Sequence, residues 1–107
     1  MMYEWAKAMN CDVTVCDTEG KIIYMNEKSL AKYGDIIGQN LYNCHNPRSG
    51  EIIKELLATG GSNTYTIEKN GQKKMIYQTA WLNEGVVGGL VEIVIELPEE
   101  MPHFVRK

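Results

Sequence analysis

Hydrophobic and polar residues alternate along the first part of the chain, after a short N-terminal segment. From Asp12 to Asp17, Val13 and Val15 alternate with Asp, Thr and Cys, which predicts a half-buried strand. The sequence Asp17-Thr18-Glu19-Gly20 has Asp at the first and Gly at the fourth position of a type I turn. We therefore predict a hairpin whose second strand runs from Lys21 to Met25.

A helical period replaces this alternation at Asn26. Asn caps helices by accepting a backbone N–H, and Gly34 is suited to end the helix that follows. The apolar face between them consists of Leu30, Ala31 and Tyr33. Residues 35–44 predict short helical turns that lie on a core. Asn46-Pro47 then starts a longer helix, because proline is favoured at the first helical position. The buried face of this helix is Ile52, Ile53, Leu56 and Leu57.

The two-residue period returns after Gly60-Gly61 and predicts three further strands. Thr64 to Glu68 and Gln72 to Leu82 flank Asn70-Gly71, a strong hairpin signal. The third strand, Val86 to Leu97, is apolar on both faces near its middle, so we expect both sides of the sheet to be covered there.

The N-terminal segment carries an apolar stripe at three- and four-residue intervals, which predicts a short helix. The stripe consists of Met2, Trp5 and Met9, with Tyr3 and Ala6 beside it. The order helix, two strands, helices, three strands predicts an α+β fold with a five-stranded antiparallel sheet and helices on one face. We divide the chain into a cap helix (1–10), one domain (11–97) and a short polar tail (98–107), since 107 residues fit a single domain.

Composition narrows the function classes. The net charge of -3 argues against nucleic acid, which requires a concentrated basic face. No apolar run approaches the roughly 18 residues that span a bilayer, and the N-terminus lacks a secretory signal, so we expect a cytoplasmic protein without membrane contact. The three cysteines form no CxxC pair, which suggests neither a disulfide framework nor a zinc site.

The elements from Cys11 to Leu97 resemble those of a PAS domain. VTVCDTEGKIIYMN is similar to the family's first hairpin, DIIGQNLYNC to its short central turns, and GVVGGLVEIVIEL to its last strand. CHNPRSGEIIKELL and MPHF resemble a ligand-sensing subgroup of bacteria and archaea with a His-x-Pro-x-Ser start to the long helix. The resemblance implies the PAS fold with strand order 2-1-5-4-3, a cavity between the sheet and the long helix, and a homodimer formed through the N-terminal cap helix. Candidate interface residues are then Met2, Trp5 and Met9.

We expect a sensory module that encloses a small, largely apolar ligand. Candidate lining residues on the helical side are Ile36, Leu41, Tyr42, Ile53, Leu56 and Leu57. Candidates on the sheet are Tyr65, Ile67, Tyr77 and Gln78. Tyr77 and Gln78 are adjacent on a strand, so only one of them points inward. The alternative for each apolar position is that it belongs to a filled core and not to a cavity wall. The alternative for the whole chain is a ligand-free homodimerisation or docking module.

The sequence gives weaker support for a bound cofactor or for an enzymatic activity. Flavin-binding members carry a reactive cysteine where this chain has Leu41, and haem-binding members use a histidine beside the long helix, which makes His45 a less favoured candidate. The residues specify no cofactor, and the downstream effector is not identified. Cys44 and His45 are neighbours without a third catalytic partner. Glu92 and Glu96 share a strand face and are expected to be solvated, so we do not expect an enzyme.

Overall fold

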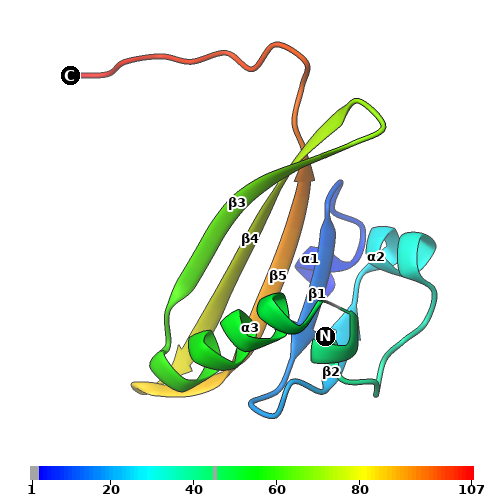
Figure 1. Cartoon of the computed structure of the whole chain (residues 1–107), viewed down its shortest axis with the longest axis vertical. Coiled ribbons are helices and arrows are strands. Elements are labelled where there is room, and N and C mark those ends of the chain that lie inside the picture. Colours follow the sequence, from blue (N-terminus) through cyan, green and yellow to red (C-terminus); the bar gives the residue numbers. More distant parts are fainter. Residues whose placement is uncertain (1–2, 45) are drawn as a thin grey trace.

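The computed structural model describes residues 3–44 and 46–107. It contains one antiparallel sheet with strand order β2-β1-β5-β4-β3, which confirms the predicted α+β fold and the predicted topology (Figure 1). The helices are α1 (Glu4–Lys7), α2 (Glu27–Tyr33), the short 3₁₀ helix η1 (Leu41–Cys44) and α3 (Pro47–Thr59). The strands are β1 (Asp12–Cys16), β2 (Ile22–Met25), β3 (Ser62–Lys69), β4 (Gln72–Asn83) and β5 (Val86–Glu96).

Two asparagine side chains begin the helices that cover the sheet. Asn26 accepts a hydrogen bond from the backbone N–H of Ser29 at the start of α2, and Asn46 accepts one from Ser49 at the start of α3. Both satisfy a backbone donor that the first helical turn leaves without a partner. Gly60 ends α3 in the left-handed region at φ 76°, where glycine is favoured. These signals were all predicted from the sequence.

The sheet separates two cores, and we call its two sides the inner and the outer face. On the inner face, α2 and α3 pack against β1 and β5 (Figure 1). The inner core consists of Cys16, Ile22, Met25, Leu41, Ile53, Leu56, Leu57 and Leu90. On the outer face, α1 covers Val13 and Val15 with Ala6, and Trp81, Val91 and Ile93 pack beside them. Both faces of β5 are therefore covered near its middle, as its apolar pattern predicts.

The N-terminal helix differs from its predicted form. It is a single turn, Glu4–Lys7, and Met9 lies beyond its end. Ala6 is the residue that α1 buries against the sheet, whereas Trp5 is 64% exposed and Met9 is also exposed. A one-turn helix has too few residues for its periodicity to show which side faces the sheet. Met2 lies outside the described residues.

Residues 98–107 follow β5 without helix or strand. The tail was expected to be polar; beside its charged residues it also exposes the apolar side chains of Met101, Phe104 and Val105. No helix within the described ranges is long and apolar enough to cross a bilayer.

Candidate functional site

A row of polar side chains crosses the middle of the inner face. Thr14 on β1 is paired with Glu92 on β5, Glu92 with Gln78 on β4, and Gln78 with Asn63 on β3. Residues that are paired across neighbouring strands point to the same face of a sheet. Thr14, Gln78 and Glu92 are buried, and Asn63 is partly buried. The inner face thus holds a line of hydrogen-bonding groups where an ordinary core would hold apolar ones.

Hydrogen bonds join this row in a fixed direction. The Asn63 Nδ2 group donates to Gln78 Oε1 at 3.2 Å, and Gln78 Nε2 donates to Glu92 Oε2 at 2.7 Å. At the other end, the hydroxyls of Thr14 and Ser29 lie 2.7 Å apart and form a hydrogen bond that links β1 to α2. The chain of amide donors ends on the Glu92 carboxylate, so the orientation of both amide side chains is set by that acceptor.

Glu92 corrects an expectation from the sequence. A solvated carboxylate was expected there, but Glu92 is only 9% exposed, whereas Glu96 is exposed on the same face. The middle of β5 is the centre of the sheet, and Gln78 stabilises the buried carboxylate with a charge-assisted hydrogen bond. The available signal was the position of Glu92 within an otherwise apolar central strand.

The structure also settles which of the adjacent residues Tyr77 and Gln78 faces inward. Gln78 belongs to the inner face, because its hydrogen-bonded partner Glu92 and the core residue Leu90 alternate along one side of β5. Tyr77 therefore points to the outer face, the side on which Trp81 packs. Tyr77 does not lie with the other candidate lining residues.

The six helical-side candidates lie together at one end of the inner face. Leu41, Ile53, Leu56 and Leu57 belong to the inner core, and Ile36 and Tyr42 pack against it. Figure 1 shows that α3 crosses this end of the sheet. Cys16 on β1 and Leu90 on β5 belong to the same core as the buried residues of α3. These positions form a packed core in the structure.

The other end of the inner face is more open. Ile67 on β3 is 42% exposed, and Tyr65 on the same strand is partly buried. Burial raises the pKa of the Tyr65 hydroxyl, and the negative charge of Glu92 raises it further. Burial also raises the pKa of Tyr33 at the end of α2, with a smaller contribution from Glu92. Tyr65 on β3 and Tyr33 at the end of α2 thus both lie close enough to Glu92 for its charge to raise their pKa.

His45 and its suggested role as a haem ligand lie outside the described residues. Among residues 3–44 and 46–107, no three His, Cys, Asp or Glu side chains are grouped closely enough to hold a metal ion. His103 is exposed in the tail.

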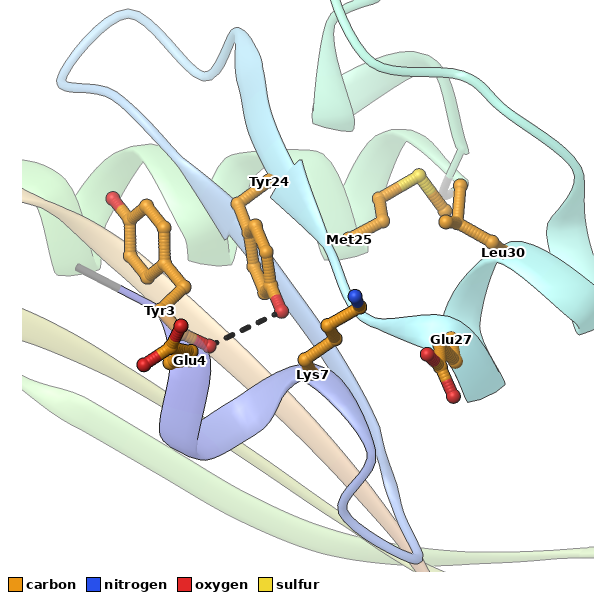
Figure 2. A pocket seen from close by; sticks show the side chains of 7 residues that line it. All are labelled: Tyr3, Glu4, Lys7, Tyr24, Met25, Glu27 and Leu30. Carbon is orange, nitrogen blue, oxygen red and sulfur yellow. Dashed lines mark hydrogen bonds between the residues drawn. The ribbon is translucent and has the colours of Figure 1, made fainter. Parts of the chain in front are cut away.

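Two hollows that the sequence does not indicate flank α1. The first has a volume of about 330 Å³ and lies between α1, β2 and the start of α2 (Figure 2). It is lined by Tyr3, Glu4, Lys7, Tyr24, Met25, Glu27 and Leu30. The second has a volume of about 320 Å³ and lies on the outer face. It is lined by Tyr3, Trp5, Val13, Val15, Trp81 and Val91.

Solved structures identify the fold. The PAS domain of BvgS from Bordetella pertussis matches with a TM-score of 0.69 and 16% identity, over 92% of this chain and 85% of that one. VqmA bound to DPO matches with a TM-score of 0.72 and 15% identity, over 92% of this chain and 57% of that one. The sensor region of a sensor histidine kinase matches with a TM-score of 0.62 and 16% identity; the match covers 79% of this chain but only 38% of that structure.

These identities are low, so the likeness concerns the fold. No family model matches the sequence, and no curated protein matches it. The TM-scores of 0.62 to 0.72 show that the backbone of this chain is arranged as in those neighbours. The chain has the PAS fold.

Proposed function

We propose that the chain is a cytoplasmic sensory module that binds a small molecule on the inner face of its sheet and signals through a homodimer. The observation that carries this proposal is the hydrogen-bonded row of Asn63, Gln78 and Glu92, of which the last two are buried, beside an uncovered part of the same face. Binding sites for small molecules combine apolar walls with a few placed polar groups. The structural neighbours include sensor regions, which agrees with a sensory role.

The polar row suggests how the ligand is oriented. Tyr65 and Ile67 on β3 offer ring and aliphatic surface, and polar atoms are offered by Gln78 on the next strand and by Glu92 on the strand after it. A ligand with an apolar body and one polar group can contact both the apolar surface and the polar atoms. The helical-side candidates, which pack as core, support the wall of the site by holding α3 in place.

The sheet provides a route from ligand to dimer. Glu92 points to the inner face, while its neighbours Val91 and Ile93 pack on the outer face near α1. A ligand that shifts β5 changes the surface on which α1 rests, and α1 presents the exposed Trp5 to a second copy. The dimer contact is therefore expected to respond to the ligand.

Native mass spectrometry of the purified chain tests this proposal. We expect a retained small molecule, or a thermal shift with one member of a metabolite panel, and we expect Gln78→Leu to abolish either signal. Asn83→Leu, at the exposed end of β4, is the matched control and should leave binding unchanged. A chain that retains nothing and shows no shift across the panel would argue against a ligand.

The second candidate is a ligand-free docking module, which the apolar hollow between Trp5 and Trp81 favours. In that case the panel has no effect, and Trp5→Glu alone changes association. The haem proposal for His45 has its own test, since it requires a visible absorption band that His45→Ala removes.

A further inference from the structure

The hollow between α1, β2 and α2 combines aromatic walls with a charged rim. The rings of Tyr3 and Tyr24 are stacked with their centroids 4.4 Å apart, and the Tyr24 hydroxyl donates to the Tyr3 carbonyl oxygen at 3.4 Å. Figure 2 shows Met25 and Leu30 on the side opposite these rings, with Lys7 between the two sides. Glu4 and Glu27 add two carboxylates to the rim, so its net charge is negative.

The last four residues of the arm formed by residues 98–107 have the complementary chemistry. Phe104 is 70% exposed and Val105 is 85% exposed, although such side chains are normally covered. Two cationic residues, Arg106 and Lys107, follow them directly. The Arg106 guanidinium lies 5.5 Å from the centroid of the Phe104 ring, so the ring and the positive charge are presented together.

The start of the arm is held in a fixed direction. The backbone N–H of Leu97 donates to Lys73 at 2.9 Å, and the Gln72 side chain donates to the Leu97 carbonyl oxygen at 3.1 Å. In the view of Figure 1, the arm leaves the end of β5 and runs away from the side on which α1 and α2 lie. Pro98 and Pro102 restrict its backbone, which lowers the entropy lost when an extended segment docks. The arm thus lies away from the hollow beside α1 and α2 of its own chain.

We propose that the arm of one copy docks in the hollow of a second copy. Phe104 enters between Tyr24 and Leu30, and Arg106 lies against Glu4 and Glu27 at the rim. A twofold axis repeats the contact, so that each copy both donates an arm and receives one. The occupant is a second copy because the apolar side chains without cover, the hollow that fits them and the opposite charges all belong to this chain.

Sedimentation equilibrium of the full chain tests the exchange of arms. We expect a dimer, and Phe104→Ala should raise its dissociation constant about 30-fold or more, since a buried aromatic anchor is a typical hot spot. Glu27→Arg and Arg106→Glu should each weaken the dimer, and the double variant should return the constant to within about threefold of the original. Glu55→Arg, on the exposed side of α3, is the control for charge reversal and should have no effect.

The outcomes separate this inference from the ligand proposal. A chain that is monomeric, a dimer that is unaffected by Phe104→Ala, or a double variant that is weaker than both single variants would overturn the exchange of arms. Ligand retention is measured separately, by native mass spectrometry of the same variants, so a result that overturns the exchange of arms does not by itself contradict the ligand proposal. The exposed position of Phe104 also means that its replacement leaves the fold intact.

Discussion

At the scale of single residues, Asn26 joins three elements. Its side-chain oxygen accepts from the backbone N–H groups of Val13 at 3.0 Å and Ser29 at 3.1 Å. Its amide group donates to the carbonyl oxygens of Ala6 at 3.0 Å and Cys11 at 2.8 Å. The side chain is buried, so no water replaces these partners without a change in structure. Asn26 thereby fixes α1 and the start of α2 to β1.

Replacing Asn26 is expected to destabilise the chain strongly. Asn26→Ala removes four hydrogen bonds to backbone groups, although the Ala6 carbonyl oxygen keeps the one from the Met9 N–H, and we expect a loss of roughly 3 kcal/mol or more in the free energy of unfolding. Asn46→Ala is the matched control, because the exposed Asn46 caps α3 with a single hydrogen bond and its removal should cost about 1 kcal/mol. Urea denaturation measures both, and equal losses would contradict the role assigned to Asn26.

The Cys16 thiol gives a second prediction at this scale. Burial raises its pKa to about 11, so at pH 8 only about one thiol in a thousand is ionised and reactive. We expect iodoacetamide to modify the partly exposed Cys11 first, and Cys16 only after urea unfolds the chain. Peptide mass mapping locates the modified residue. Labelling of Cys16 in the folded chain at the rate of Cys11 would contradict its burial.

Some residue roles were predictable and others depended on tertiary contacts. The cap formed by Asn26 follows from its place before a helical pattern, but its three other bonds join segments far apart in the sequence. The burial of Glu92 depends on its central strand and on Gln78. Alternation alone does not decide which side of a strand faces a helix, so Tyr77 and Gln78 were left as alternatives.

At the scale of elements, Gly20 shapes the first hairpin in two ways. It adopts φ 84°, and a Cβ atom built on it would lie 2.7 Å from the ring of Tyr42. Gly71, in the hairpin between β3 and β4, has φ 80° but no atom within 4 Å of such a Cβ. The two glycines share a backbone conformation and differ in their surroundings.

This pair yields a prediction for the hairpins. Gly71→Ala should cost about 1 kcal/mol from backbone strain alone, whereas Gly20→Ala should cost about 2–4 kcal/mol because the Tyr42 ring must also move. Thermal unfolding monitored by circular dichroism gives the decrease in melting temperature of each variant under the same conditions. Similar shifts would mean that Tyr42 moves aside freely.

Some helices and strands were predicted from the sequence more accurately than others. All five strands, α2 and α3 were predicted within a few residues, because turn residues and asparagine caps mark their ends. The single turn of α1 has neither a side-chain cap nor a full period, so its buried face was not predictable. The open end of the inner face was also missed, since it depends on where α3 crosses the sheet.

At the scale of the whole molecule, the sheet separates the proposed surface for a ligand from the proposed surfaces for a second copy. Neighbouring residues of β5 point to opposite faces of the sheet. Glu92 belongs to the polar row on the inner face, and Val91 lines the hollow beside Trp5 on the outer face. The hollow beside Tyr24 lies at the edge of the sheet, next to β2. Both proposed contacts of the dimer therefore involve α1, through Trp5 on one side and through Tyr3 and Glu4 on the other.

The role of α1 in association can be tested apart from the arm. Trp5→Glu and Met9→Glu place charges on exposed apolar positions of the proposed interface, and we expect each to shift the chain toward monomers in sedimentation velocity. Val86→Glu is the control, because Val86 is 69% exposed but lies at the start of β5, next to the turn that follows β4. If Trp5→Glu leaves the dimer intact while Phe104→Ala dissociates it, the arm alone holds the two copies together. A ligand signal would then have to reach the dimer through Tyr24 on β2.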